Sequence, residues 1–303
     1  MITRRTFLRG IGVAVGTGIG LAGYAFGVEP LYRLSVTTYR LSPRTWPAGF
    51  RLRLAVVADV HAHRHSMPIA RIDEIVSVTN GLGADAVLLL GDYMSGKYWR
   101  LPRIAAEDWA PVLGQLRAPL GVHAVLGNHD WWEEPDAQRL RRGPVQSRLQ
   151  LEKAGIPVYE NDVVRLTKDG QPFWLAGLAD QIAFITGIVD GRMVFQGLDD
   201  LDGTLARVTD DAPVILMAHE PDIFPKVPDR VALTISGHTH GGQVRLFGWS
   251  PIVPSEFGNR YAYGHVIEDE RHLIVSGGLG CSILPVRFGV PPEIVVVELG
   301  ADA

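Results

Sequence analysis

Short apolar runs alternate with longer mixed segments from about residue 51 onward, and this alternation restricts the possible folds more than any other feature of the chain. Residues 52–58, 86–90 and 122–126 have the length and apolar content of buried strands. The spacing of apolar residues predicts helices between them, at 69–82 and 104–116. Strands separated by helices indicate βαβ units, so the sequence predicts an α/β fold with helices on both faces of a sheet.

The second half of the chain is richer in glycine and in strand-like runs, and it contains one predicted helix near 198–208. We predict strands there at 173–176, 214–217, 232–235, 244–247, 263–267, 272–275 and 294–297. No internal repeat is visible and no linker rich in Pro, Gly or Ser divides the halves. We therefore predict one domain over 51–303 whose two halves share a site, preceded by a linker or first strand region at 31–50.

Residues 1–30 differ in composition from the rest of the chain. Residues 3–9 carry three arginines, and residues 10–28 contain no charged side chain. A basic segment before an apolar one is typical of an export signal, and the adjacent Arg4 and Arg5 resemble the twin-arginine signal. A stretch of 19 uncharged residues is also long enough to span a bilayer, so a transmembrane helix is the alternative.

The fate of this segment stays open at the sequence level. Gly23-Tyr24-Ala25 is the nearest approximation to a signal-peptidase site, so cleavage and retention as a membrane anchor are both possible. An export signal implies the twin-arginine machinery as a partner. It also places the protein in the periplasm, on the outer face of the cytoplasmic membrane, or in the cell wall.

Charge and cysteine content exclude several classes of function. The net charge is −4, with +2 in residues 1–30 and −6 in the remainder, and a mildly acidic body argues against nucleic-acid binding. Cys281 is the single cysteine, so neither an intramolecular disulfide nor a cysteine-based zinc cluster can form. A metal ion would have to be bound by His, Asp, Asn or Glu.

Polar side chains collect just after five of the predicted strands. They are Asp59, His61, Asp92, Asn128, His129, Asp130, His219, His238 and His240. Ligands of α/β folds bind beyond the carboxyl ends of strands, so we expect one shared location. Carboxylates, imidazoles and an amide oxygen suit Mn, Fe, Co or Zn. The set is too large for one tetrahedral ion and fits two ions ~3.5–4 Å apart.

Two histidines lie one residue apart and are flanked by glycines at residues 236–242 (SGHTHGG). In extended backbone His238 and His240 would point to the same side, with Thr239 turned away. We predict that the two imidazoles bind different ions and that the glycines let the backbone pass close to the site. The alternative is a polar turn with two solvated histidines.

The order and spacing of these residues resemble the signature of the calcineurin-like metallophosphoesterase superfamily. The matching segments are DVH at 59–61, GD at 91–92, GNHD at 127–130, AH at 218–219 and GHTH at 237–240. The segments LPVR at 284–287 and PPEI at 291–294 further resemble its exported bacterial phosphodiesterase branch. The resemblance covers about residues 50–299. It implies a four-layer α/β/β/α sandwich with two mixed sheets and a metal site at the carboxyl ends of the strands.

The resemblance also implies a role for each site residue. One ion would be bound by Asp59, His61, Asp92 and His240, and the second by Asp92, Asn128, His219 and His238, with Asp92 as the bridge. His129 would be the proton donor or a phosphate contact, and Asp130 would orient it. Structural capping of strand ends is the alternative explanation for Asn128 and Asp130.

Several positions depart from related branches. Gly91-Asp92 continues into Tyr93 without the Asp-Arg-Gly of protein serine/threonine phosphatases, and Ser95 stands where purple acid phosphatases have a tyrosine ligand. His63 and His65 are additional histidines, for which spare ligands, phosphate contacts or solvated side chains are possible, the last being our expectation. Aromatic residues near the first motifs either line a substrate groove or pack in the core: Tyr93, Tyr98, Trp99, Trp109, Trp131 and Trp132.

The expected function is hydrolysis of a cell-envelope phosphodiester. Two cations neutralise an anionic phosphodiester, and a hydroxide that bridges them would attack phosphorus in line while His129 protonates the leaving oxygen. One alternative is a pyrophosphatase of the type that cleaves a UDP-linked diacylglucosamine in lipid A synthesis. The other is a metal-dependent wall-binding module without turnover, which the presence of both Asp92 and His129 disfavours.

Overall fold

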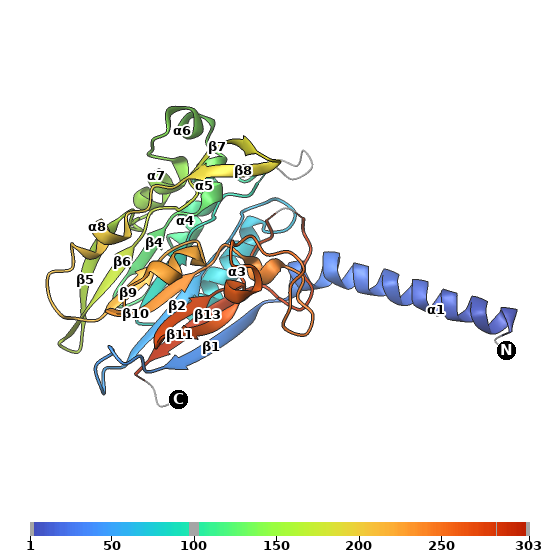
Figure 1. Ribbon diagram of the computed structural model, residues 1–303, viewed down its shortest axis with the longest axis horizontal. Helices are drawn as coiled ribbons and strands as arrows, with labels where there is room; N and C mark the ends of the chain where they lie inside the picture. The colour runs from blue at the N-terminus through green and yellow to red at the C-terminus, as the bar shows by residue number, and fades with distance from the viewer. Residues whose placement is uncertain (1–2, 97–102, 283, 301–303) are drawn as a thin grey trace.

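Two mixed β-sheets form the centre of the protein in the computed structural model, which describes residues 3–96, 103–282 and 284–300. The first sheet has the strand order β1-β13-β2-β3-β4. Its strands are Ser35–Leu41, Glu293–Leu299, Leu52–Val57, Ala86–Leu90 and Val122–Val125. Strands β2, β3 and β4 are parallel, and β13 runs antiparallel to β2 and parallel to β1. The first and last strands of the domain therefore pair at one edge (Figure 1).

The second sheet has the order β11-β12-β10-β9-β6-β5. Its strands are Gly264–Glu268, Arg271–Val275, Val231–Ser236, Val214–Met217, Gln171–Gly177 and Asp162–Lys168. The four central strands are parallel, and the two edge strands are antiparallel to their neighbours. A separate hairpin consists of β7 (Phe184–Val189) and β8 (Arg192–Gln196).

Helices cover the outer faces of both sheets (Figure 1). The helices between β2 and β5 in the sequence are α3 Ile69–Asn80, α4 Ala106–Leu113, α5 Asn128–Trp132, α6 Pro135–Leu140 and α7 Gln146–Lys153. Those among the strands of the second half are α8 Leu201–Leu205, η2 Pro221–Lys226, η3 His240–Gly242 and η4 Gly258–Tyr261. The apolar spacing of α3 explains its position, because Ile72, Ile75 and Val76 are buried against the first sheet.

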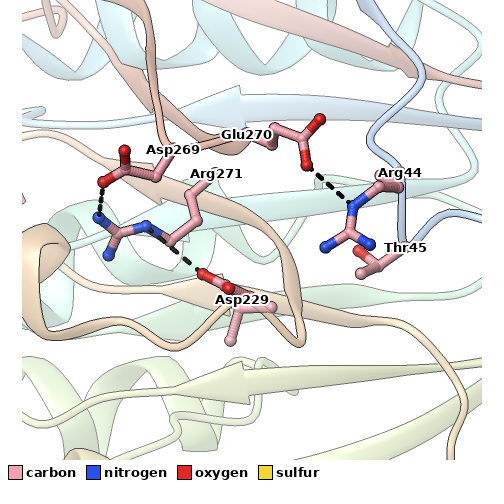
Figure 2. Close-up of a pocket in the computed structure, with 7 residues that line it drawn as sticks. Arg44, Thr45, Asp229, Asp269, Glu270 and Arg271 are labelled. Atoms are coloured by element: carbon pink, nitrogen blue, oxygen red, sulfur yellow. Dashed lines mark hydrogen bonds and ion pairs between the residues drawn. The ribbon is translucent and has the colours of Figure 1, made fainter.

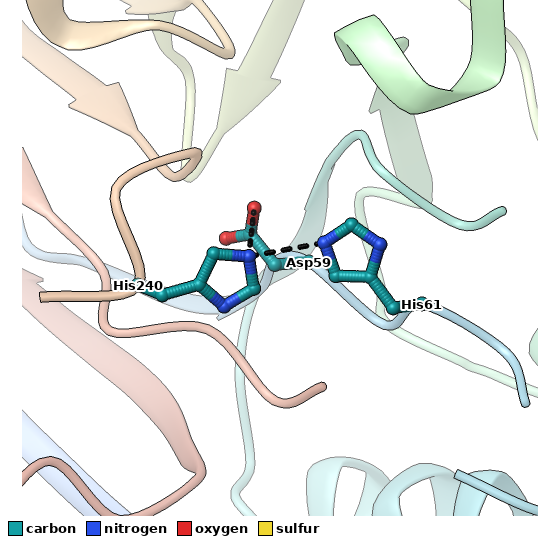
Figure 3. A group of neighbouring side chains, drawn as sticks. All are labelled: Asp59, His61 and His240. Atoms are coloured by element: carbon teal, nitrogen blue, oxygen red, sulfur yellow. Dashed lines mark hydrogen bonds and ion pairs between the residues drawn. The ribbon is translucent and has the colours of Figure 1, made fainter. Parts of the chain in front are cut away.

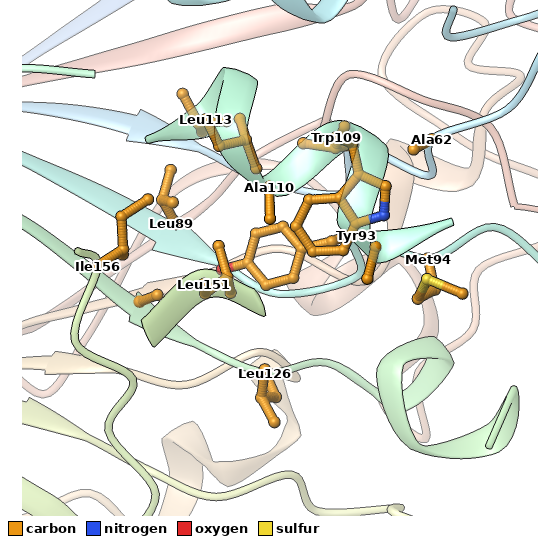
Figure 4. Close-up of a cluster of buried hydrophobic side chains, with 14 of the residues drawn as sticks. Ala62, Leu89, Tyr93, Met94, Trp109, Ala110, Leu113, Leu126, Leu151 and Ile156 are labelled. Carbon is orange, nitrogen blue, oxygen red and sulfur yellow. The ribbon is translucent and has the colours of Figure 1, made fainter. Parts of the chain in front are cut away.

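Three layers of apolar side chains separate the four structural layers. One lies between the helices and the first sheet, one between the two sheets, and one under α8 and η2. In the first of these, Trp109 of α4 stacks on Tyr93 with ring centroids 5.3 Å apart (Figure 4). Both rings are fully buried, and the Tyr93 hydroxyl donates to the Val125 carbonyl at 2.9 Å. The predicted four-layer α/β/β/α sandwich is confirmed.

The N-terminal segment is helical from Arg4 to Tyr32, as α1 (Arg4–Gly23), the π-helix η1 (Tyr24–Val28) and α2 (Glu29–Tyr32). By length and composition it could cross a membrane. Figure 1 shows α1 projecting alone from the body. The following turns pack on the body, where Glu29 is buried and its Oε1 accepts a hydrogen bond from the Val290 amide at 2.9 Å.

Most predicted strands are present with ends within about two residues of the prediction. The strand predicted at 244–247 is wrong, because this segment is a loop with only two isolated bridges, from Val244 to Phe288 and from Leu246 to Trp249. Gly242 before it has a φ of 76° and Phe247 a φ of 51°, which turn the chain out of extended geometry. The helix predicted near 198–208 is limited to Leu201–Leu205.

A shallow pocket lies at the amino-terminal ends of β10 and β12 (Figure 2). Its charged groups pair with one another, with Arg44 3.1 Å from Glu270 and Arg271 3.5 Å from Asp269 and 3.8 Å from Asp229. Exposed pairs of this kind contribute little to stability. The pocket lies at the end of the sheet opposite the polar side chains that the sequence singles out, so it is not a candidate site.

Candidate metal centre

The carboxyl ends of five parallel strands bring the predicted ligands together between the two sheets. Asp59 and His61 follow β2, Asp92 follows β3 and Asn128 follows β4. His219 follows β9, and His238 and His240 follow β10. All are buried except His238, which is partly buried. The site therefore draws three strand ends from the first sheet and two from the second.

One group of donor atoms consists of Asp59, His61 and His240 (Figure 3). Their ligand atoms lie within 4.8 Å of one another. The two Nε2 atoms of His61 and His240 face each other at 3.0 Å, and His240 Nε2 lies 3.7 Å from Asp59 Oδ1. Asp59 Oδ2 is buried and has no hydrogen-bond partner among the described residues. A cation between these atoms would satisfy all three side chains.

A second group consists of Asp92, His219 and His238. Asn128 joins it, because its Oδ1 lies 2.8 Å from His238 Nδ1. His219 Nε2 is buried and has no hydrogen-bond partner within the part of the chain that the structure describes. These atoms are a carboxylate oxygen, two imidazole nitrogens and an amide oxygen, which suit a borderline divalent ion.

Asp92 connects the two groups. Its Oδ2 lies 3.4 Å from His61 Nε2 in the first group and 3.4 Å from His219 Nε2 in the second. Its Oδ1 accepts a hydrogen bond from the His129 amide at 2.8 Å. The geometry therefore places one carboxylate where a bridge between two ions would have to lie.

Backbone carbonyls fix the orientation of two of the imidazoles. His61 Nδ1 lies 2.9 Å from the Met94 carbonyl oxygen, and His219 Nδ1 lies 2.6 Å from that of Leu90. Because a carbonyl only accepts, each Nδ1 carries a ring proton, so the neutral form of each imidazole presents its Nε2 lone pair to the site. These tautomers are the ones that metal binding through Nε2 requires.

His240 is oriented differently, by the fully buried Arg287. The guanidinium donates to the carbonyls of Gly277 at 2.8 Å, Val290 at 3.0 Å and Gly280 at 2.9 Å, and its Nη2 lies 3.1 Å from His240 Nδ1. In the sequence this arginine belongs to the LPVR segment at 284–287, which resembles the exported branch but implies no role for any single residue. Its contacts show that it fixes the loop after β12 against the imidazole.

Burial sets the pKa of some site residues, and neighbouring charges set the pKa of others. It raises the pKa of Asp59 to about 7 and lowers the pKa of His61 to about 3. Burial alone would also raise the pKa of Asp92, but His219 and His129 hold it well below its usual range. A buried carboxylate and buried neutral imidazoles gain most from a cation, so these groups fit divalent ions.

The backbone at these residues is strained. Five of the seven predicted ligands have a positive φ, between 44° and 68°: Asp59, His61, Asp92, His238 and His240. Non-glycine residues rarely adopt this region, and such residues cluster at functional sites. The positive φ values of His238 and His240 also show that the extended backbone predicted for 238–240 is wrong. The two imidazoles reach different donor groups through left-handed turns, while the Thr239 hydroxyl donates to the Ala262 carbonyl at 2.7 Å.

Comparisons with known proteins identify the family. The family model for calcineurin-like phosphoesterases matches residues 52–242. The chain belongs to this family. It is 29% identical to the uncharacterised metallophosphoesterase YkuE of Bacillus subtilis over 98% of both chains. It is 27% identical to the phosphodiesterase YaeI of Escherichia coli, over 99% of this chain and 100% of that protein. It is 30% identical to a transmembrane protein with metallophosphoesterase domain of Danio rerio, over 82% of this chain and 53% of that protein. The chain is therefore a metal-dependent phosphoester hydrolase.

His129 lies at the rim of this metallophosphoesterase site. Its ligand atom lies within 4.8 Å of those of His61 and Asp92. Its Nε2 lies 3.4 Å from the Ser282 hydroxyl, and its Nδ1 lies 3.6 Å from Glu133 Oε1. Burial would lower its pKa, but Asp92 and Glu133 raise it above the ordinary value. A histidine that holds its proton beside the site suits a proton donor.

Asp130 does not orient His129, which corrects the role predicted for it. Its Oδ2 accepts hydrogen bonds from the amides of Asp92 at 2.9 Å and Gly127 at 3.0 Å. Its Oδ1 accepts from the amides of Tyr93 and Met94 and from the Ser147 hydroxyl. The carboxylate fixes the backbone that carries Asp92. Glu133, one helical turn after His129, is the carboxylate beside the imidazole.

The additional histidines and the aromatic residues are also placed. His63 is buried and its Nδ1 accepts from the amides of His65 and Ser66, so it closes a turn and is not a solvated side chain, whereas His65 is exposed. Tyr93, Trp109 and Trp131 are core residues. Trp132 borders the site, 5.4 Å from the His129 ring and stacked on Phe195. Tyr98 and Trp99 lie outside the described residues.

A buried carboxyl pair beside the second donor group was missed. Asp180 follows β6, Glu220 follows His219, and both side chains are buried. Burial, together with Glu220, raises the pKa of Asp180 well above its usual range. The backbone amide of Gln181 donates a hydrogen bond to Glu220 Oε2 at 3.1 Å. The signal was available in the sequence, because Asp180 comes after a predicted strand just as the ligands do.

Proposed function

We propose that the protein is a dinuclear phosphodiesterase of the cell envelope. The observation that carries this proposal is Asp92 Oδ2, which lies 3.4 Å from an imidazole nitrogen of each donor group. Asp59, His61 and His240 would hold one ion and Asn128, His219 and His238 the other, with Asp92 shared. Mn, Zn, Fe and Co all suit this donor set.

The bound ions would neutralise the phosphate charge and lower the pKa of a water molecule so that it attacks phosphorus. The chain's own contribution lies at the rim. Asp92 and Glu133 raise the pKa of His129, which favours its protonated form, and its Nε2 lies toward Ser282, where a leaving oxygen would accept a proton. Asp130 keeps the backbone of 92–94 in place during turnover.

A preference for diesters is supported by the printed name of the Escherichia coli relative, phosphodiesterase YaeI, which this chain matches over its whole length. The match to the metallophosphoesterase YkuE over 98% of both chains is equally compatible with this activity.

The N-terminal helix is proposed to be a retained anchor that follows a twin-arginine signal. The nearest cleavage candidate ends at Ala25, which is buried and whose carbonyl accepts a hydrogen bond from the Arg287 amide at 2.9 Å. Glu29, four residues later, is also buried. A signal peptidase needs an extended, accessible segment, whereas residues 24–28 here are a π-helix packed on the body.

The test is hydrolysis of bis-p-nitrophenyl phosphate and of p-nitrophenyl phosphate by the full-length enzyme. It would be measured after chelation and after re-addition of each of the four metals, with metal content counted in parallel. Two ions per chain and metal-restored diester turnover are expected. Asp92→Asn should lose both, and Asp169→Asn, an exposed turn residue, is the matched control. Two ions without turnover of either ester would instead favour the binding module, and faster monoester turnover would contradict the diester preference.

A further inference from the structure

An apolar loop projects from the body directly after the metal site. It comprises residues 244–252 and follows η3, which contains His240. Phe247 is fully exposed, Ile252 is 77% exposed and Trp249 is 59% exposed. Gly248 between the two aromatic residues has a φ of 82°, so the chain turns sharply at this tip. Large apolar side chains held in water on a turn cost free energy unless something covers them.

The same loop is attached to the base of the N-terminal helix. The Arg245 amide donates to the Phe288 carbonyl, and the Phe288 amide donates to the Gln243 carbonyl, both at 2.8 Å. The Phe288 ring packs edge-on against Tyr24, with centroids 6.1 Å apart. Figure 1 shows the orange loops of this region beside the base of α1, at the same end of the body.

The loop is also connected to the rim of the metal site. Gln243 Oε1 accepts a hydrogen bond from the Ser282 amide at 2.7 Å, and the Ser282 hydroxyl lies 3.4 Å from His129 Nε2. The loop, the base of the helix and the site rim are therefore linked by direct contacts. A membrane crossed by α1 would lie next to both the loop and the rim.

We propose that the apolar loop inserts into the bilayer that α1 crosses and that the substrate is a phosphodiester in a lipid headgroup. The proposal deepens the proposed function and depends on it for the substrate class. Four exposed apolar side chains in the loop, the three above and Leu246, are too few for a stable protein interface, which buries about 800 Å² on each partner. They suit a lipid surface, where Trp and Phe are enriched, and the neighbouring α1 exposes apolar side chains of the same kind.

The docking arm of the test uses nitroxide labels on the full chain in vesicles of phosphatidylcholine and phosphatidylglycerol. Phe247→Cys carries the label in a Cys281→Ala background, because Cys281 is the single native cysteine. Thr167→Cys, exposed on β5 at the far end of the body, is the control (Figure 1). Label 247 should collide more with oxygen than with a water-soluble chromium complex, and label 167 the reverse. Equal exposure of both labels to the chromium complex would overturn the proposal.

The activity arm compares two chromogenic diesters that undergo the same reaction. A water oxygen bonds to phosphorus, the bond from phosphorus to the aryl oxygen breaks, p-nitrophenolate leaves, and the water proton goes to solvent. One ester is soluble bis-p-nitrophenyl phosphate and the other is hexadecyl p-nitrophenyl phosphate embedded in the vesicles. The triple substitution Phe247→Ser, Trp249→Ser and Ile252→Ser should lower kcat/KM roughly tenfold or more on the embedded ester alone.

The outcomes separate the two proposals. Equal effects of the triple substitution on both esters would contradict a role of the loop at the membrane. If the unmodified enzyme hydrolyses neither ester, the phosphodiesterase proposal fails, while the label at position 247 still decides whether the loop enters the bilayer.

Discussion

Two glycines beside the metal site offer a way to disturb its ligands by adding a single methyl group. A Cβ at Gly127 would lie 2.4 Å from Asp92 Oδ1 and 2.6 Å from His219 Cε1. A Cβ at Gly237 would lie 2.6 Å from Asp59 Oδ2. Carbon atoms pack at about 3.5–4.0 Å, so each methyl group would displace a ligand by roughly 1 Å. Metal–ligand distances tolerate only about 0.2 Å.

We therefore expect Gly237→Ala to weaken the ion of the first group. Gly127→Ala should weaken both ions, because Asp92 is shared, with the larger loss at the second group, to which His219 also belongs. Displaced supporting groups typically cost 10- to 100-fold in metal affinity, which is about 1.4–2.8 kcal/mol. Overpacking should cost a further ~1–3 kcal/mol of unfolding free energy. Competition with a chelator, followed by metal counting, measures the affinity. Gly187→Ala is the control, because no atom of residues 3–96, 103–282 or 284–300 outside its chain neighbours lies within 4 Å of its Cβ position. Wild-type affinity for both ions in the Gly127 and Gly237 variants would refute the ligand geometry.

Three further predictions concern single side chains. His129→Ala should keep its metal but lose turnover, roughly 10²- to 10⁴-fold with an alkoxide leaving group and much less with p-nitrophenolate. Asp92→Ala should lose both metal and turnover. Equal losses of His129→Ala turnover with the two leaving groups would exclude a role of His129 as the acid. Asp130→Asn places a donor opposite backbone amides and should lower the unfolding free energy by roughly 1–3 kcal/mol, while the pH profile of turnover keeps its shape. Burial lowers the pKa of both His265 and His272, so their neutral pair stabilises the fold above pH 6.5, and this stabilisation is lost as pH falls below 6.5. Urea unfolding at about pH 7.5 and at about pH 5.5 measures the effect. Between these two pH values, the unfolding free energy should fall less for His265→Gln than for wild type.

The sequence allowed prediction of the strands and of the polar groups at their ends, because both depend on local signals. Buried parallel strands such as β3 and β9 are short apolar runs, and their predicted ends match the structure. The ligands then follow from the rule that carboxyl ends of parallel strands converge. Asp180 also follows a predicted strand, so the same rule could have predicted its position beside the ligands.

Other features depend on contacts between residues far apart in the chain. Arg287 acts on His240 from 47 residues away, and nothing near either residue in the sequence indicates the contact. Asp130 is adjacent to His129 in sequence, but the short helix α5 points its carboxylate toward the amides of 92–94. The run at 244–247 has strand composition, and the left-handed turns on either side of it override that preference.

Anomalous diffraction from crystals of the full-length enzyme reconstituted with manganese tests the account most directly. The account predicts two peaks per chain. One should lie within coordinating distance of Asp59, His61 and His240, the other within coordinating distance of Asn128, His219 and His238, with Asp92 reaching both. A single peak, or peaks away from these side chains, would contradict a dinuclear site bridged by Asp92.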